Sequence, residues 1–252
     1  MPHKPSPVTI QDPQIKTRNS SPATNKGFST MASLEQTWGH ERLVASAYDF
    51  AVHNPLVRRI GAFALWGLDA RLLMDYIARL RETTAGSRVL DVPCGGGLAF
   101  ASLQPNHALD YVAFDFSPVM LERAQQSAQQ LGLKGIQFQQ GDVGALPYEA
   151  QQFDLCQCYN GLHCFPDPQK AIQEMARVLK VGGTLRTTLV VKGAGTRYDA
   201  MICLFQWRGW FGPTCTRAAL EGWLKDANLK LTDHQQSGAL WMFEAVKQTP
   251  TP

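Results

Sequence analysis

The sequence has 252 residues, of which 44% are hydrophobic and 18% are charged, a composition typical of a globular protein with a buried core. The formal net charge of +3 lies in the first 34 residues, which hold four basic residues and one acidic residue, so the rest of the chain is neutral. A neutral body argues against nucleic acid as a partner, and no apolar run approaches the roughly 18 residues that a membrane span requires.

Residues 1–34 are rich in proline, serine and threonine and have almost no large apolar side chains. Such a segment buries too little surface to offset the entropy of ordering it, so we expect a disordered tail or leader. It lacks the apolar stretch of a secretory signal, but it could be an organelle transit segment, or translation could start at Met31. The expected location is the cytoplasm, or an organelle matrix if residues 1–30 are a transit segment.

The six cysteines are scattered and include no Cys-x-x-Cys pair. Cys156 and Cys158 alternate on a predicted strand, and with Cys164 nearby they could hold zinc or a soft metal. Small core residues that stay reduced are the stronger interpretation. We therefore expect no metal site.

Residues 35–84 have a helical pattern and are predicted to form an N-terminal helical lid. The residues that recur at helical spacing near its end are Leu68, Leu72, Leu73, Tyr76, Ile77 and Leu80. Gly86 then ends the helical pattern.

From residue 85 to residue 248, short apolar strands alternate with helices. The expected strands span residues 88–93, 111–115, 136–142, 153–159 and 183–191. Helices are expected to begin at Ser117-Pro118 and at Pro168, and the second of them to end at Gly182-Gly183. This alternation predicts an α/β fold with a Rossmann-like, doubly wound parallel sheet.

The end of the chain departs from this alternation. After a helix over residues 216–227, two strands are expected within residues 229–246, joined by a tight turn near Ser237-Gly238. They would add an antiparallel hairpin to the sheet edge.

The first strand ends in the stretch VLDVPCGGG, residues 89–97, where Asp91 precedes a proline and three glycines. Gly95 to Gly97 are expected to form the turn into the next helix, and glycine is needed where a ligand lies against the backbone. A dinucleotide loop would have a third glycine where Phe100 stands, and a phosphate-binding loop would have a Gly-Lys-Ser/Thr sequence that is absent. With an acid before it and no basic residue in it, the loop favours a cationic ligand, which argues against a nicotinamide-dependent oxidoreductase.

Acidic residues close the first three strands: Asp91, Asp115 and Asp142. The carboxyl ends of parallel strands meet at one edge, where ligands bind. Asp115 can accept hydrogen bonds from both hydroxyls of a ribose, and Asp142 can accept one from an exocyclic amine. A nucleoside with a positively charged substituent suits this edge, and S-adenosylmethionine is the expected ligand.

Five stretches carry a family resemblance: VLDVPCGGG, AFDFSPVML, GDVGALPY, FDLCQCYNGLHCF and EMARVLKVGGTL. In order and spacing, across roughly residues 85–245, they resemble the signature blocks of the class I S-adenosylmethionine-dependent methyltransferases. Within that class, residues 47–73 are similar to the lid of the ubiquinone/menaquinone biosynthesis (methyltransferase type 11) branch. The resemblance implies a seven-stranded sheet and a methyl-transferring enzyme.

The resemblance also implies a set of cofactor contacts at the strand ends and in the loops after them. They are Asp91, Cys94, Gly95 and Gly97 for the methionyl end, Asp115 for the ribose, Asp142 and Val143 for the adenine, and Phe116, Met120, Tyr159 and Tyr48 around these. Tyr48 would either close over the cofactor or pack between helices. Pro93 stands where the family usually has glycine, and it stiffens the entry to the loop.

His163 follows the fourth strand and is the candidate catalytic residue. Methyl transfer from a sulfonium depends mainly on approach geometry, so a base is needed only if the acceptor must lose a proton. His163 could abstract that proton or orient the acceptor, or it could have no catalytic role. The adjoining residues 159–162 lack the Pro-Pro-aromatic stretch of enzymes that methylate nucleic-acid bases.

Residues 198–212 crowd four aromatic residues together: Phe205, Trp207, Trp210 and Phe211. They predict an aromatic cover over the acceptor, which would be small and flat or hydrophobic, such as a quinone or another secondary metabolite. The same segment could instead be a core helix or a membrane-surface patch. A homodimer is possible, and so is a non-catalytic regulatory or assembly protein that binds S-adenosylmethionine, since fold alone does not fix function.

Overall fold

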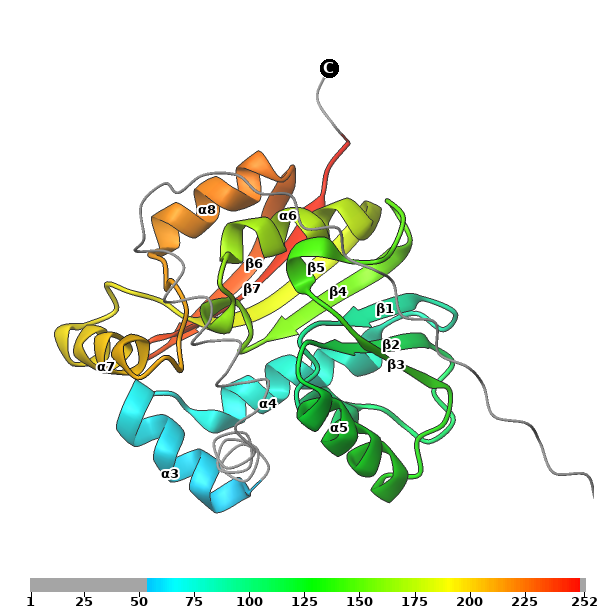
Figure 1. Cartoon of the computed structure of the whole chain (residues 1–252), viewed down its shortest axis with the longest axis horizontal. Helices are drawn as coiled ribbons and strands as arrows, with labels where there is room; N and C mark the ends of the chain where they lie inside the picture. Colours follow the sequence, from blue (N-terminus) through cyan, green and yellow to red (C-terminus); the bar gives the residue numbers. More distant parts are fainter. Residues whose placement is uncertain (1–53, 250–252) are drawn as a thin grey trace, which may run out of the picture.

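The computed structural model describes residues 54–249. Its centre is a seven-stranded sheet in the order β3-β2-β1-β4-β5-β7-β6 (Figure 1). The strands are β1 (Arg88–Asp91), β2 (Asp110–Asp115), β3 (Ile136–Gln140), β4 (Phe153–Tyr159), β5 (Leu179–Val190), β6 (Leu229–Ser237) and β7 (Leu240–Lys247). The first five are parallel, whereas β7 is antiparallel to β5 and to β6. The expected doubly wound sheet with a terminal hairpin is confirmed.

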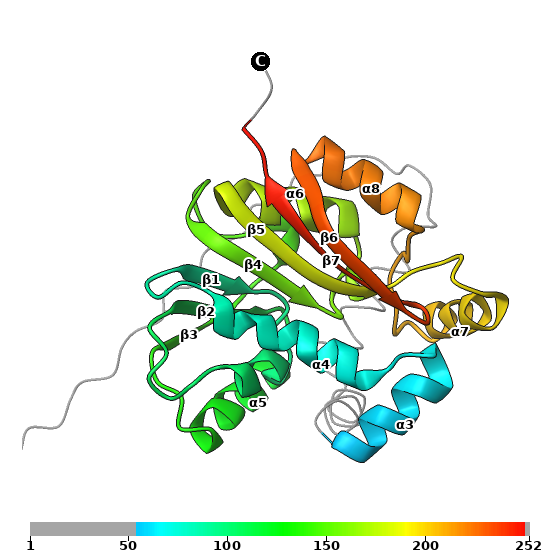
Figure 2. The same cartoon turned by 180° about the vertical axis from the view of Figure 1, so that it is seen from behind.

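Helices cover both faces of this sheet. On one face lie α4 (Ala70–Ala78) and α5 (Pro118–Gln130), and on the other lie α6 (Pro168–Val178) and α8 (Arg217–Asp226). Figure 2, seen from behind, shows α4 lying across the sheet, with α3 (Pro55–Trp66) and α7 (Thr196–Trp207) together at one end. Each face has its own cluster of buried apolar residues, so the β-strands are covered on both sides.

Capping residues begin the helices as the sequence indicates. The Ser117 hydroxyl accepts from the Met120 N–H at 3.3 Å, and an Asp167 carboxylate oxygen accepts from the Lys170 N–H at 2.9 Å. In both helices a proline stands directly after the cap, where its missing N–H costs nothing. These local signals set the entry of α5 and α6 onto opposite faces of the sheet.

Three local expectations are wrong. The helix before β5 does not continue to Gly182-Gly183, because Leu179 already pairs with Phe153 and the strand passes through the glycines with a shift of register. The glycine loop leads into a short 3-10 turn, η2 (Leu98–Ser102), and not into an α-helix. Leu72, expected on the inner face of its helix, is 40% exposed.

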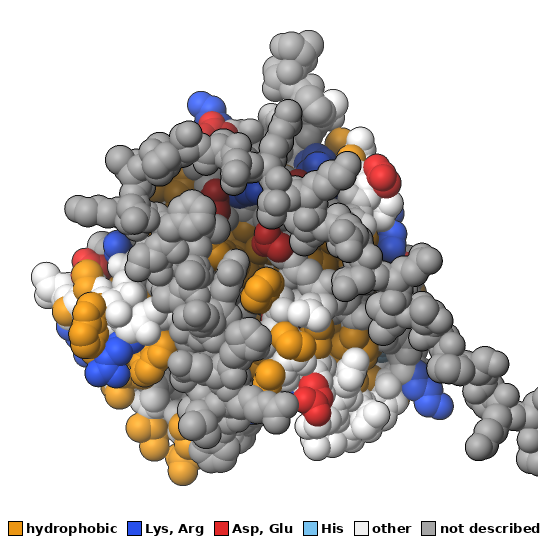
Figure 3. Space-filling model, in the orientation of Figure 1, with side chains coloured by type: hydrophobic (Ala, Val, Ile, Leu, Met, Phe, Trp, Pro, Cys, Tyr) orange, Lys and Arg blue, Asp and Glu red, His pale blue; other side chains and the backbone are white. Residues whose placement is uncertain are grey.

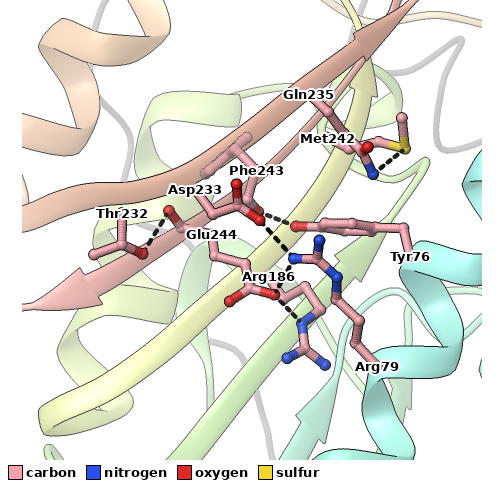
Figure 4. A network of polar contacts seen from close by, with 9 residues as sticks. All are labelled: Tyr76, Arg79, Arg186, Thr232, Asp233, Gln235, Met242, Phe243 and Glu244. Atoms are coloured by element: carbon pink, nitrogen blue, oxygen red, sulfur yellow. Dashed lines mark hydrogen bonds and ion pairs between the residues drawn. The ribbon is translucent and has the colours of Figure 1, made fainter.

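A polar network joins α4 to the terminal hairpin (Figure 4). Arg79 pairs with Asp233 at 2.6 Å and with Glu244 at 3.1 Å, and Glu244 also accepts from the Nε–H of the buried Arg186 at 2.9 Å. The Tyr76 hydroxyl donates to the Phe243 carbonyl oxygen. These contacts fix the helix that precedes β1 against the strand that ends the chain.

The hairpin also contacts the junction between α3 and α4. The Ala239 N–H donates to the Trp66 carbonyl oxygen at 2.8 Å, and the Asp69 N–H donates to the Ser237 hydroxyl at 3.0 Å. A Cβ on Gly238 would clash with the backbone of Trp66 and Gly67, so the turn needs glycine there because the two backbones approach so closely.

Parts of the expected organisation stay predictions. The 1–34 tail and Tyr48 lie outside the described residues, and the division into a lid and a cofactor domain is untested; α3, α4 and η1 (Arg79–Glu82) make up the described part of residues 35–84. Between residues 54 and 249 no helix is long and apolar enough to cross a membrane. Within the same range no three His, Cys, Asp or Glu residues gather as metal ligands, and Cys156 and Cys158 are packed in the core.

Candidate cofactor site

Asp91 and Asp115 are the last residues of the neighbouring strands β1 and β2. Both are buried. Asp142 follows β3, the next strand outward, and lies exposed as the cap of a short turn, η3 (Val143–Ala145), where its carboxylate accepts from the Gly144 N–H at 2.8 Å. The sheet order therefore places the three carboxylates in sequence along one edge.

The glycine loop after β1 is held directly to Asp115. The Gly95 N–H donates to Oδ2 of Asp115 at 2.9 Å, and Oδ1 of Asp115 accepts from the Ser117 N–H at 2.8 Å. The Cys94 N–H donates to the Phe114 carbonyl oxygen at 2.9 Å. The carboxylate that is expected to bind the ribose thus also fixes the loop that is expected to bind the methionyl end.

Two glycines of the loop have different roles. Gly95 has a φ of 53°, and a Cβ built on it would meet no described atom within 4 Å, so its outer side is open. Gly97 has a φ of 87°, and a Cβ there would clash with the ring of Phe100. The missing side chain of Gly95 leaves space that a ligand could occupy. The missing side chain of Gly97 instead leaves room for the Phe100 ring, which packs on its backbone.

Burial raises the pKa of both acids. The pKa of Asp91 rises to about 7, and Asp115 adds to the rise while hydrogen bonds from Tyr111 and Gln157 oppose it. The pKa of Asp115 rises to about 6, again through burial, against the hydrogen bonds from the backbone. None of the described groups that shift these two pKa values is a cation. A positively charged ligand would lower both values and stabilise the ionised pair.

Tyr111 and Gln157 complete the hydrogen bonding around Asp91 in the candidate site, and sequence reasoning missed both. The Tyr111 hydroxyl donates to Oδ2 of Asp91 at 2.7 Å and accepts from the Gln157 side chain at 2.7 Å. Both side chains are fully buried. A glutamine inside the apolar strand CQC was the available signal, since a buried amide needs a partner.

The other expected cofactor residues lie around this edge. Val143 and Met120 are buried at the starts of η3 and α5, and Phe116, directly after Asp115, is 44% exposed. Pro93 precedes the glycine loop and lies where a Cβ on Gly161 would clash with its ring. These positions are compatible with their predicted roles, which stay predictions.

Tyr159 ends β4 and is buried on the face of the sheet that α4 covers. Its ring packs edge-on to Tyr76, with the ring centroids 6.4 Å apart. Its hydroxyl has no hydrogen-bond partner among the described residues. Burial raises the pKa of this hydroxyl, so it is neutral.

His163 lies in a short turn, η4 (Leu162–Cys164), and is buried. Its Nδ1 accepts from the Val190 N–H at 3.3 Å, and its ring packs against Phe211 with centroids 4.4 Å apart. Burial lowers the pKa of His163 to about 3. Because Nδ1 is an acceptor, the proton of the neutral ring is on Nε2. This histidine is arranged to donate a hydrogen bond and not to take up a proton.

The predicted aromatic cover is only partly assembled as expected. Phe205 packs on Phe211 and Trp210 at centroid distances of 5.2 and 5.1 Å, and Trp66 of α3 joins the group by stacking on Phe211 at 5.7 Å. Trp207, by contrast, is 77% exposed and lies outside this group. The cluster thus contains Trp66, which comes from another helix and which sequence reasoning missed because it lies far from residues 198–212.

A comparison with protein families decides the identity of the chain, because the family described as "Methyltransferase domain" matches residues 83–232, more than half of the sequence. The chain belongs to this family. With the fold and the strand-end carboxylates, the match assigns it to the class I S-adenosylmethionine-dependent methyltransferases, for which S-adenosylmethionine is the methyl donor. The resemblance in the sequence is thereby confirmed at the level of the class.

Curated relatives of this methyltransferase match it over a limited region. An uncharacterized methyltransferase YcgJ of Bacillus subtilis is 36% identical over 110 residues, 44% of this chain and 43% of the relative. A ubiquinone biosynthesis O-methyltransferase of Coxiella burnetii is 38% identical over 103 residues, 41% of this chain and 43% of the relative. The matched region spans less than half the length of these relatives.

Solved structures share the fold over a larger part of the methyltransferase. The YcgJ structure covers 71% of this chain and 100% of its own, with a TM-score of 0.60 at 18% identity. A geranyl diphosphate methyltransferase in complex with GPP and sinefungin covers 87% of this chain and 99% of its own, with a TM-score of 0.66 at 12% identity. These structural similarities show that the chain shares the fold of these two proteins.

Proposed function

We propose that this chain is an enzyme that transfers a methyl group from S-adenosylmethionine to a small, flat or hydrophobic acceptor. The observation that carries the proposal is the buried pair Asp91 and Asp115, whose pKa values rise to about 7 and about 6 beside the open backbone of Gly95. Among the described residues no cation shifts the pKa of either acid, and two buried acids of this kind destabilise the site until a positive charge arrives.

The residues at this edge fit the cofactor in the following way. Asp91 would hold the ammonium group of the methionyl part, with Gly95 leaving room for the chain and Gly97 allowing the loop to pack on Phe100. Asp115 already accepts from two N–H groups, and its remaining lone pairs would accept from the ribose hydroxyls. Asp142 and Val143 would contact the adenine, with Phe116 and Met120 on either side. When bound, S-adenosylmethionine supplies a methyl group on a cationic sulfur with a neutral thioether as leaving group.

The acceptor is proposed to bind against the cluster formed by Trp66, Phe205, Trp210 and Phe211. Aromatic walls of this kind favour a flat or hydrophobic molecule. The name of one relative, a ubiquinone biosynthesis O-methyltransferase, and that of a structural neighbour, a geranyl diphosphate methyltransferase, support a quinone-like or prenylated acceptor. His163 would orient this acceptor by donating from Nε2, because its lowered pKa makes it a poor base.

The proposal also concerns the kind of partner, the cellular location and the oligomeric state, which do not depend on the geometry of the site. A small molecule is favoured over nucleic acid as the partner because the chain beyond residue 34 carries no net charge. A cytoplasmic location and a homodimer remain proposals. No observation on the described residues favours a non-catalytic regulator, so that alternative is not carried further.

Binding measurements with the full chain test the cofactor site. We expect S-adenosylmethionine to bind with micromolar affinity by calorimetry, and Asp115→Ala to weaken binding at least about a hundredfold, because it removes the ribose acceptor and the anchor of the loop. Asp226→Ala, an exposed acid at the end of α8, is the matched control and should bind normally. Equal affinity of Asp115→Ala and wild type would overturn the site.

Turnover tests the reaction itself. The enzyme is incubated with methyl-labelled S-adenosylmethionine and a panel of phenols, quinols and prenylated compounds, and transfer of label is measured. Label on at least one member supports the proposal. Tight cofactor binding with no transfer to any of these classes would reject the hydrophobic acceptor and leave the cofactor site intact.

A further inference from the structure

The described surface has an unusual apolar face on α3. Leu56, Ile60 and Phe63 follow one another at spacings of four and three residues, so they form a single stripe along the helix. They are 67%, 61% and 68% exposed. Most surface helices turn such a stripe to the core, whereas here the partly buried side of α3 is the one that carries Ala62 and Trp66.

A neighbouring helix extends the same kind of surface. Trp66 of α3 packs edge-on against Phe205 of α7 at a centroid distance of 5.5 Å, so the two helices are in contact. Next to Phe205 in sequence, Leu204 is 43% exposed and Trp207 is 77% exposed. Figure 3 shows hydrophobic side chains gathered over α3 and α7 at one edge of the molecule, with basic side chains beside them. We call these five exposed residues, Leu56, Ile60, Phe63, Leu204 and Trp207, the apolar edge.

The two described segments that carry the apolar edge hold charges of one sign. Residues 54–68 and 200–212 contain arginines and no acidic residue. Arg59 and Arg208 are exposed, and neither pairs with a described carboxylate. The guanidinium of Arg208 lies over the Trp207 ring, 5.2 Å from its centroid. The acids next along the chain, Asp69 and Asp199, accept hydrogen bonds from nearby backbone N–H groups.

Protruding apolar side chains with a tryptophan and arginines at their border have the chemistry of a helix that lies in a lipid–water interface. The apolar tips enter the acyl region, and the guanidinium groups reach the phosphates of anionic lipids. A second copy of the chain is a poorer occupant, because a two-fold interface would bring arginines toward arginines with no carboxylate between them.

We propose that the apolar edge is a docking surface for anionic lipid bilayers, on which the protein lies peripherally. The proposal is independent of the acceptor, since it concerns the outer sides of α3 and α7. If the protein did not bind lipid bilayers, the proposed cofactor site would still stand.

The first experiment is co-sedimentation of the full chain with vesicles of phosphatidylcholine alone and with phosphatidylglycerol added. We expect binding to the anionic vesicles that weakens as salt is raised. Phe63→Asp and Ile60→Asp should each lower the partition coefficient about tenfold or more, because an apolar anchor is replaced by a charge that anionic lipid repels. Val181→Asp, at another exposed apolar residue (45%) near the start of β5, is the control and should bind as the wild type does.

The second experiment separates the charges from the apolar anchors. Arg208→Gln should lower binding to anionic vesicles about fivefold and leave the weak binding to phosphatidylcholine unchanged. Tryptophan emission should shift to the blue on addition of anionic vesicles, and Trp207→Phe should lose most of that shift while still binding.

Three results would overturn the proposal. The wild type could stay in the supernatant with both kinds of vesicle, or Phe63→Asp could bind as well as Val181→Asp. Light scattering could also show a dimer that Phe63→Asp dissociates, which would assign the face to a second copy. Circular dichroism of each variant establishes that it is folded, and unchanged S-adenosylmethionine binding shows that the cofactor site is intact.

Discussion

The hydroxyl of Tyr111 donates a hydrogen bond to Oδ2 of Asp91 at 2.7 Å, with both side chains fully buried. The tyrosine lies on β2, at the position that pairs with Val89 of β1, and so reaches the end of the neighbouring strand. A hydrogen bond to the ionised form of an acid lowers its pKa. Tyr111 therefore favours the charge on Asp91 that a cationic ligand needs, against the effect of burial.

The first prediction concerns this bond. Tyr111→Phe should raise the pKa of Asp91 further and weaken S-adenosylmethionine binding near neutral pH about tenfold, because a hydrogen bond to a charged group is lost. Calorimetry over a pH series measures it, and the affinity should recover toward the wild-type value as pH is raised. Tyr148→Phe, in the apolar cluster on the other face of the sheet, is the control. A loss that is the same at every pH would point to packing alone.

The second prediction concerns stability against pH without cofactor. The pKa of Asp91 rises from 3.8 to about 7 on folding, so its protonated form favours the folded state. That contribution is complete below about pH 4 and is lost as pH rises through 7. Relative to Asp91→Asn, which cannot ionise, the wild type should lose a few kcal/mol of unfolding free energy over this range. Urea denaturation at several pH values tests this, and a gap that widens in the opposite direction would contradict it.

The third prediction uses the two glycines of the loop as a pair. Gly95→Ala should fold, with a stability cost of about 1 kcal/mol for its positive φ, but should bind S-adenosylmethionine much more weakly because the methyl group occupies the open side of the loop. Gly97→Ala should instead destabilise the fold by a larger amount, because its Cβ displaces Phe100. Thermal unfolding and calorimetry on both variants distinguish the two effects, and the reverse pattern would exchange their roles.

The fourth prediction concerns the network of Figure 4. Glu244→Gln removes the carboxylate between Arg79 and Arg186 and should lower the unfolding free energy by about 3 kcal/mol, because the buried Arg186 loses its counter-charge. Asp233→Asn, at the exposed end of the same network, should cost less than about 1 kcal/mol. Denaturant titrations give both values. Equal costs would mean that burial of Arg186 does not matter.

The fifth prediction concerns His163. Because the pKa of this side chain is about 3, it stays neutral over the working range, and the pH dependence of kcat should not report its titration. His163→Asn keeps an acceptor for the Val190 N–H and should lower kcat without moving the pH profile between about pH 6 and 9. A profile that loses one limb in the variant would show that His163 does act as a base.

Most helices and strands were predictable because the signals that begin and end them lie within a few residues of each other in the sequence. Ser117 with Pro118 begins α5, and an acid ends each of β1 and β2. The error at Gly182-Gly183 arose because strand pairing between Leu179 and Phe153 is a long-range contact that outweighs the local preference of two glycines to end a helix.

The site was predictable only in part for the same reason. Asp91 and Gly95 lie in one short stretch of the chain and can be recognised there from the sequence. Tyr111 and Gln157, by contrast, meet Asp91 only through the pairing of three strands. Trp66 likewise meets Phe205 across more than a hundred residues. Such partners cannot be assigned from spacing, because the register of the strands decides them.

The contact between the hairpin turn and the α3–α4 junction has a consequence for synthesis. Trp66 and Asp69 are hydrogen-bonded to Ala239 and Ser237, so these two contacts cannot form during synthesis until the β6–β7 hairpin has been translated. A protein shortened before β6 would lack both of these contacts, and its β5 edge would have no β7 partner. Such a truncated product is expected to be removed by proteases, because an unpaired strand edge favours aggregation and a destabilised chain is degraded.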